Sequence, residues 1–393
     1  MIKKINDYVD FKSINLSVKY LSISALFTGI ALGYFFTLVV IIAKYQNFAE
    51  SIIGIISGSF SLGLMLAGFM VSKILDRFGL YKTMSIAISM QTICVTLAFI
   101  FFNPVSLILN SFIMGLFGGM VWMTMDTWVN LVSNNENRGK NIGFYNSAIT
   151  IGFAIGPLII GIFGSKGLFP IFSAIFLMII RTPVIMLIKR QVENVNIPRL
   201  EKKMNFSYIK FAPFIFLVIF ISGVIDSSFA SLFPAFMINE FFSDKHIGYL
   251  FFIGLIFGVL SQPFVGALAD KVSKRKIIIS LLVFHLLWPI LLSYFISNTL
   301  IICLAIIFWG IASTSLYTVT LAYLGERINI SELTIATSVF IIIFEFGEFI
   351  GPIIVGFVMD LFGNSGFIFS PLIFTSLCII VGILRAFYKK NEV

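Results

Sequence analysis

Residues 211–238 read FAPFIFLVIFISGVIDSSFASLFPAFMI, and Asp226 is the one charged residue among these 28. A helix of about 20 apolar residues crosses the hydrocarbon core of a bilayer. The stretch is therefore predicted to be a membrane-spanning helix. Its single carboxyl group lies near the middle of the span, where an ion is costly.

The rest of the chain has the same character. Of 393 residues, 59% are hydrophobic and 11% are charged, and the mean hydropathy is +1.04. A water-soluble fold needs far more surface charge. We predict an all-α polytopic membrane protein with 12 transmembrane helices in two six-helix pseudo-repeats, at about residues 19–43, 50–72, 83–102, 104–132, 140–164, 167–188, 211–238, 246–268, 277–296, 299–326, 333–360 and 366–387.

Basic residues are distributed unevenly between the two sides of these spans. Of the 27 Lys and Arg residues, 23 lie on the side of the termini, Lys44, Lys166 and Lys245 lie on the other side, and Arg181 lies inside a span. The positive-inside rule then predicts both termini in the cytoplasm, with the chain in a bacterial inner membrane. The net charge of +9 sits in short loops, so we expect no nucleic-acid partner.

One long polar connection, residues 189–210, divides the spans into an N-terminal bundle (1–188) and a C-terminal bundle (211–393). The two parts match each other at a nearly constant offset along the chain. The matched pairs are Gly29 with Gly223, Asp76 with Asp270, Gly152 with Gly347, Gly156 with Gly351, Pro157 with Pro352 and Gly161 with Gly356. Such order indicates an internal duplication, which is common in secondary transporters.

The loop after the eighth span reads GALADKVSKRK, residues 266–276, and a weaker copy follows the second span. This pair resembles the loop signature of the major facilitator superfamily. The resemblance implies a latch on the cytoplasmic side, built from Gly266, Asp270, Lys271 and Arg275 in one copy and Asp76, Arg77, Gly79 and Lys82 in the other. The first copy departs from the signature at Ser72 and Leu80.

Further motifs are similar to two branches of that superfamily. The fifth span carries Gly152, Gly156 and Pro157, similar to a motif of proton-coupled drug exporters. Because Gly347, Gly351 and Pro352 repeat the pattern, we interpret these residues as helix packing sites. A resemblance to the YcaD-like branch is carried by Asp126, Trp128, Asn130, Arg138, Gly139, Tyr145, Leu316, Tyr317, Gly325, Glu326 and Arg327. It implies no substrate.

Five ionisable residues lie at membrane depth, where a charge costs ~2.5–3.5 kcal/mol on insertion scales. They are the candidates for proton coupling or solute binding: Asp226, Glu345, Glu348, Asp126 and Arg181. Desolvation favours a neutral carboxyl group, whereas a nearby Arg favours the ionised form, so alternating surroundings can drive proton uptake and release. A fixed ion pair or a packing contact is the alternative for each. The duplicate position of Asp226 is Leu32, so this charge belongs to one half.

Hydroxyl groups on the first and tenth spans are candidates for the wall of a solute cavity, which the resemblance places along these helices. They are Tyr34, Thr37, Tyr317, Thr318 and Thr320. Hydrogen bonding between helices would account for them equally well.

The function that we predict is secondary active transport of a small organic solute by alternating access, coupled to protons, with efflux of an amphipathic compound favoured. The alternative is a proton-coupled importer of a polar metabolite, sugar or siderophore; a receptor or a channel is a further class. We expect a monomer in the bilayer without cofactor, metal or enzymatic activity, because the sequence contains neither a phosphate-binding loop nor a metal-ligand motif.

Overall fold

The structure is a computed structural model that describes residues 16–133, 138–191, 206–269 and 271–390. Within these ranges the chain is helical and contains no strand. The helices are α2 (Leu16–Tyr45), α3 (Glu50–Ile100), α4 (Pro104–Leu131), α5 (Arg138–Phe163), α6 (Phe169–Ile179), α7 (Arg181–Gln191), α8 (Tyr208–Phe211), α9 (Pro213–Asn239), α10 (Asp244–Ala269), α11 (Lys274–Phe295), α12 (Thr299–Gly325), α13 (Ile330–Phe362) and α14 (Asn364–Lys390).

Eleven helices of the described chain are long and apolar enough to cross a membrane, and one of them crosses twice. In α3 the backbone leaves the helix at Gly79, with φ 73° and ψ 170°, so the helix reverses direction there. Only glycine adopts such a positive φ readily. The helices α6 and α7 together make one span. The predicted all-α fold with 12 crossings is therefore confirmed.

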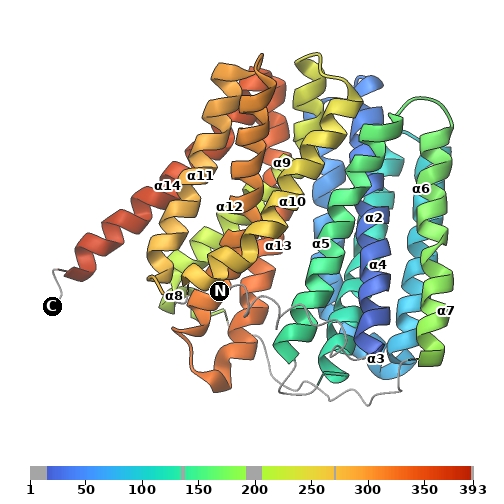
Figure 1. The fold of residues 1–393 in the computed structure, drawn as a ribbon, viewed down its shortest axis with the longest axis horizontal. Coiled ribbons are helices and arrows are strands. Elements are labelled where there is room, and N and C mark those ends of the chain that lie inside the picture. The colour runs from blue at the N-terminus through green and yellow to red at the C-terminus, as the bar shows by residue number, and fades with distance from the viewer. Residues whose placement is uncertain (1–15, 134–137, 192–205, 270, 391–393) are drawn as a thin grey trace.

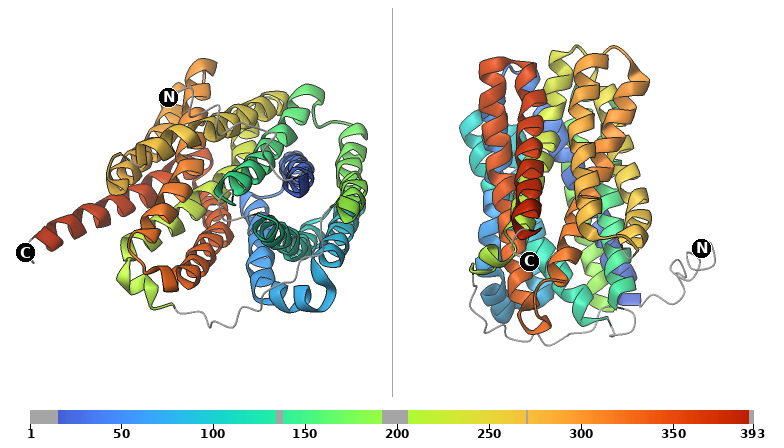
Figure 2. Two further views of the ribbon diagram at one scale, coloured as in Figure 1. Left: turned by 60° about the horizontal axis from the view of Figure 1, so that its bottom comes forward. Right: turned by 90° about the vertical axis from the view of Figure 1, so that its left-hand side faces the viewer.

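The ends of the spans gather on two faces of the molecule. We name them by their residues: the Leu16 face holds the start of α2 and the turn at Gly79, and the Glu50 face holds the starts of α3 and α10. The Leu16 face is at the bottom of Figure 1. The first six spans (α2–α7) and the last six (α9–α14) stand side by side, as Figure 1 and the view from the Leu16 face in Figure 2 show.

The duplication seen in the sequence recurs as matching contacts within the two groups. A side chain on Gly29 of α2 would overlap the backbone of α5 at Ile149 and Phe153. A side chain on the matched Gly223 of α9 would overlap the backbone of α13 at Phe344 and Glu348, which are the duplicate positions of those two residues. Small residues let helix backbones approach closely in a membrane. The pair α2 and α5 and the pair α9 and α13 therefore pack in the same way.

The two groups share one buried core toward the Glu50 face and have separate cores toward the Leu16 face. The shared cluster contains Leu38 and Ile53 of the first group with Phe229 and Leu232 of the last. Two further clusters each contain one group only, the first with Leu21, Met84 and Trp128, the other with Phe216, Leu324 and Phe340. The described chain is thus joined most firmly at the Glu50 face.

Two matched pairs of helices make this junction, α3 with α13 and α10 with α5. Gly54 of α3 lies against the carbonyl of Pro352, and Gly248 of α10 lies against the carbonyl of Pro157. The two glycines occupy matched positions of the duplication, and so do the two prolines. Both prolines lie inside their own helices, and their carbonyl groups face the glycines of the other group.

Candidate functional site: a carboxyl cluster

Asp226 lies in the middle of α9 and receives two hydroxyl hydrogen bonds. Ser313 Oγ of α12 donates to Oδ1 over 2.5 Å, and Ser222 Oγ, one turn earlier in α9, donates to Oδ2 over 3.2 Å. The Asp226 side chain is half-buried. Both donors are neutral, so they orient the carboxyl group without neutralising its charge.

Glu345 and Glu348 lie three residues apart on α13, and therefore on one face of that helix. Their carboxyl groups are in hydrogen-bonding contact with each other, and Glu348 also lies within electrostatic range of Asp226. The second oxygen of Glu345, Oε2, is buried without a hydrogen-bond partner among the described residues. We call Asp226, Glu345 and Glu348 the carboxyl cluster.

Glycines allow the carboxyl cluster to form by bringing α9 and α13 together. Gly223 lies against the backbone nitrogen of Glu348, and Gly347 lies against the carbonyl of Phe220. Gly351 fits in the same way against the carbonyl of Val224. Larger side chains at these positions would separate the helices and move the carboxyl groups of α13 away from Asp226.

No cation of the described chain forms an ion pair with the carboxyl cluster. The described chain contains two ion pairs, Lys44 with Glu50 and Lys274 with Glu326. Both join residues at the ends of helices, away from the cluster. Two carboxyl groups in contact cannot both ionise at low cost, and a lone ionised one needs a partner at membrane depth. The cluster can therefore hold a proton or a cationic group.

The structure does not bring Arg181 to the carboxyl cluster. Arg181 begins α7 in the first group, is 1% exposed, and donates from Nη2 to Gln91 Oε1 over 2.9 Å. Gln91 donates in turn to the carbonyl of Met114. This buried guanidinium is held by neutral partners within the first group, and its Nε has no partner among the described residues.

Asp126 lies on α4 in the first group. It interacts with Trp122 on the same helix and with Tyr145 of α5, although the Tyr145 hydroxyl does not reach hydrogen-bonding geometry. Tyr317 of α12 lies within electrostatic range of Asp126 as well as of Glu345 and Glu348. Its ring packs edge-on against Phe340 and Phe344. Among the candidate residues, Tyr317 thus lies near both Asp126 and the carboxyl cluster.

Three of the other four candidate hydroxyls donate to backbone carbonyls within their own group of spans. Tyr34 donates to the carbonyl of Pro170 over 3.2 Å and is fully buried, and Thr37 donates to the carbonyl of Gly33 over 2.8 Å. Thr318 is exposed and donates to the carbonyl of Thr314, and Thr320 is buried without a partner among the described residues. Within the described chain, none of these four hydroxyls contacts the carboxyl cluster.

The predicted latch residues lie at the Leu16 face, except that Asp270 is outside the described residues. Gly79 makes the turn of α3, and Gly266 lies in the last turn of α10 with open space around it. Arg275 donates to the carbonyl of Gly382 over 2.8 Å. Four latch residues are exposed: Asp76, Arg77, Lys82 and Lys271.

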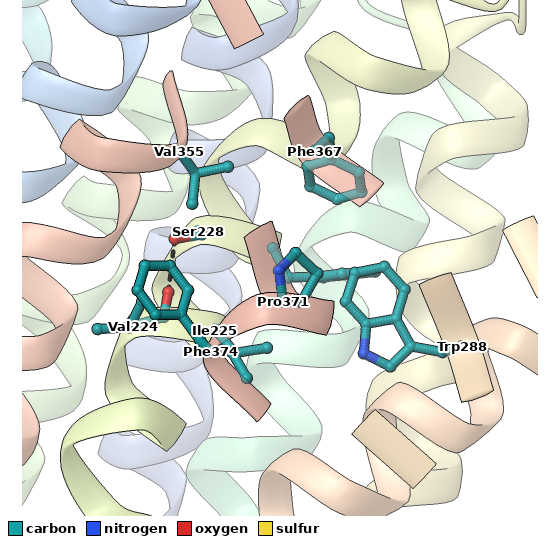
Figure 3. A pocket seen from close by; sticks show the side chains of 9 residues that line it. Val224, Ile225, Ser228, Trp288, Val355, Phe367, Pro371 and Phe374 are labelled. Atoms are coloured by element: carbon teal, nitrogen blue, oxygen red, sulfur yellow. Dashed lines mark hydrogen bonds between the residues drawn. The ribbon is translucent and has the colours of Figure 1, made fainter. Parts of the chain in front are cut away.

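A small pocket beside α9 is separate from the carboxyl cluster (Figure 3). Its walls are almost entirely apolar, and the one hydroxyl in them, that of Ser228, donates a hydrogen bond to the carbonyl of Val224. The lining residues are Val224, Ile225, Ser228, Phe229, Trp288, Val355, Phe367, Pro371 and Phe374. All of these residues belong to α9, α11, α13 and α14, so the pocket lies within the packed interior of the last six spans.

Comparison with known families accounts for the duplicated architecture. The family model described as Major Facilitator Superfamily matches residues 21–214 and again residues 215–393. The chain belongs to the major facilitator superfamily. The resemblance to this superfamily that the loop signature carries is thereby confirmed.

Relatives of this superfamily member carry names without a substrate. The chain is 25% identical to the uncharacterized MFS-type transporter MJ1560 of Methanocaldococcus jannaschii, over 91% of this chain and 95% of that one. It is 23% identical to the uncharacterized MFS-type transporter YfkF of Bacillus subtilis, over 89% and 90%. It is 20% identical to YcaD of Escherichia coli, over 86% and 87%, as the YcaD-like resemblance predicts.

Solved superfamily structures share the fold. A mutant of the nucleoside transporter NupG superposes with a TM-score of 0.77 at 14% identity, covering 94% of this chain and 98% of that one. A bacterial homolog of the human lysosomal transporter Spinster, in an inward-facing and occupied conformation, gives 0.73 at 13% identity, covering 95% and 96%. At such identities the likeness concerns the fold.

Sequence reasoning missed the partners of the candidate residues. Ser222 could have been found, because it lies four residues before Asp226 and so on the same helix face. Ser313 and Gln91 could not, since they meet Asp226 and Arg181 from 87 and 90 residues away. Such pairs depend on how the spans pack, which hydropathy does not encode.

Proposed function

We propose that this superfamily member is a proton-coupled secondary transporter of a small organic solute, in which the carboxyl cluster binds the coupling proton and a cationic group of the solute in turn. The observation that supports it is the cluster itself: three carboxyl groups on two touching helices, none in an ion pair within the described chain. Export of a cationic amphipathic compound fits this site best.

Orientation and domain division are parts of the same proposal. We infer that the Leu16 face is cytoplasmic, since 23 of the 27 basic residues belong to that side and the positive-inside rule applies to such loops. We further infer that the bundles 1–188 and 211–393, which the connection 189–210 divides in the sequence, rock against each other. The core that they share at the Glu50 face, and lack at the Leu16 face, fits an inward-facing arrangement.

Alternating access gives the carboxyl cluster two environments. When the cluster is open to the acidic side a carboxyl group gains a proton, and when it is open to the cytoplasm the proton leaves and a cation can take its place. Asp226, which is held by Ser313 and Ser222, is the primary proton carrier in this scheme. Glu345 and Glu348, which contact each other, are the next candidates.

The test uses purified protein in proteoliposomes with an imposed pH gradient. The probe is a fluorescent amphipathic quaternary ammonium dye, with an uncharged dye of the same ring system as its matched control. We expect the cation, and not the neutral dye, to move toward the acidic compartment and to stop when the gradient is collapsed. Dye movement indifferent to the gradient would refute proton coupling, and solute movement away from the acidic compartment would favour the importer.

A further inference from the structure

The start of α3 lacks a capping side chain of its own. The first N–H groups of a helix have no partner inside the helix, and Ser, Thr, Asp or Asn at the preceding position accepts one of them. In α3 that position is Ala49, whose backbone is extended (φ −61°, ψ 148°) and whose methyl group accepts no hydrogen bond. The first amides of α3 therefore need a partner from elsewhere.

Asp360 of α13 supplies this partner from the other group of spans. Its Oδ1 accepts the backbone N–H of Glu50 over 2.9 Å, and its two oxygens accept the N–H of Ser51 over 3.3–3.4 Å. Asp360 lies in the last turn of α13, where the negative end of the helix dipole disfavours an acidic side chain. Its charge is stabilised by the positive end of α3 and not by its own helix.

Side chains around Glu50 reinforce the same contact. Glu50 Oε1 accepts from Lys44 of α2 over 2.5 Å and from Asn239 of α9 over 2.9 Å. Asn239 also donates to Asn364 over 2.9 Å, and Asn364 donates to Glu240 over 2.6 Å. Polar groups of both groups of spans thus surround the start of α3.

At the matched junction between α5 and α10 the acidic residue is on the other partner. It lies at the start of α10 and not at the end of the facing helix, as Asp360 does. Asp244, the match of Glu50, accepts the N–H and the hydroxyl of Ser165, the match of Asp360, each over 2.7 Å. Asp244 begins α10, so its carboxylate remains at the positive end of its own helix if the groups part. Asp360 would instead be left at the negative end of α13, and α3 would be left uncapped.

We propose that Asp360 is a positioning residue that caps α3 across the two groups only while the Glu50 face is closed, and thereby favours the closed conformation. The inference rests on the alternating access proposed above. Opening the Glu50 face would then cost the free energy of the hydrogen bonds between the end of α13 and the start of α3. A cap within α3 would remove that cost, because it would persist in both conformations.

The test is a pulsed electron paramagnetic resonance distance measurement in liposomes without solute or gradient. Spin labels are placed at Gln46→Cys and Ser297→Cys, exposed positions on the Glu50 face of each group, after replacement of Cys94, Cys303 and Cys378 by Ala. We expect Asp360→Ala to raise the ratio of long to short distances about fivefold, the equilibrium effect of one helix cap. Asp360→Asn, which keeps an acceptor oxygen, should give a smaller rise.

Ala49→Ser separates this role from a general loss of stability. It adds a capping hydroxyl to α3 in both conformations, so we expect it to raise the long-distance population about twofold. It also keeps the test decisive if Asp360→Ala does not fold. The control Asn103→Ala removes a cap that α4 receives from its own preceding residue, within the first six spans, and should leave the ratio unchanged. An unchanged ratio in the Asp360 variants, or a fall with Ala49→Ser, would overturn the inference.

The outcome is independent of the transport assay. If gradient-driven flux is absent but Asp360→Ala still shifts the distances, the proposed function fails and the cap stands. If flux is normal and neither the Asp360 variants nor Ala49→Ser shift the distances, the cap fails and the proposed function stands.

Discussion

Ser313 Oγ of α12 donates a hydrogen bond to Asp226 Oδ1 of α9 over 2.5 Å. The contact joins two helices of the last six spans at the depth where the chain has its most central carboxyl group. A hydroxyl donor stabilises an ionised carboxylate more than a neutral carboxyl group. In the proposed transport cycle, Ser313 would therefore stabilise the deprotonated carboxylate of Asp226 without pairing its charge.

We predict that Ser313→Ala slows proton-driven transport by about three- to tenfold, in keeping with the ~0.5–1.5 kcal/mol that a typical hydrogen bond contributes. Initial rates in proteoliposomes measure this effect. The matched control is Ser315→Ala, a buried serine two residues later whose neighbour is Ser261 and not a carboxyl group. Equal rates in both variants would remove Ser313 from the coupling site.

Glu345 and Glu348 are predicted to share one proton, because two carboxyl groups in contact do not ionise together at low cost. This shared proton would add to the one that Asp226 carries, so replacing either residue by Gln should lower the number of protons moved per solute while solute binding is retained. The ratio follows from the solute gradient that balances a known pH gradient. A ratio unchanged in both variants would assign these residues to structure.

The close approach of α9 and α13 is predicted to be intolerant of side chains at Gly347. A Cβ there would overlap the carbonyl of Phe220, so Gly347→Leu should destabilise the protein by about 1–3 kcal/mol and lower its Tm in detergent. Gly143→Leu is the control, because nothing lies within 4 Å of a Cβ at that position. A Tm that falls equally in both variants would count against close packing at Gly347.

Both termini are predicted to be cytoplasmic. A reporter enzyme that works only in the cytoplasm should be active when fused after Val393, and one that works only outside should be inactive. The uneven distribution of Lys and Arg is the physical reason, since short loops rich in these residues stay in the cytoplasm. The reverse pattern of activity would refute the orientation.

Hydropathy predicted the spans well because lipid requires each crossing to be a helix of sufficient length. The glycine matches at a nearly constant offset likewise predicted the duplication, and the contacts of Gly29 and Gly223 repeat it in space. Composition could not show that α3 continues to Gly79, since the loop residues around Asp76 are polar in either case. Only the positive φ at Gly79 shows where the helix reverses.

The sequence predicted which residues are candidates for the site, but not which of them contact one another. Asp226, Glu345 and Glu348 share one group of spans, whereas Arg181 pairs with Gln91 in the other. Which intramembrane charges meet depends on the rotation of each helix about its axis and on contacts between segments that are distant in the sequence. The contact of Asp360 with α3 could not be predicted for the same reason, because its partners are backbone amides that any sequence supplies.

We propose that Asp226 carries the coupling proton. The most direct measurement compares gradient-driven accumulation of solute with solute exchange at equal pH, in the same proteoliposomes, for the unmodified chain and for Asp226→Asn. We predict that Asp226→Asn abolishes accumulation and leaves exchange largely intact, because an amide can fill the site but cannot release a proton. Full accumulation by Asp226→Asn would contradict the claim, and loss of both activities would make Asp226 a solute ligand instead.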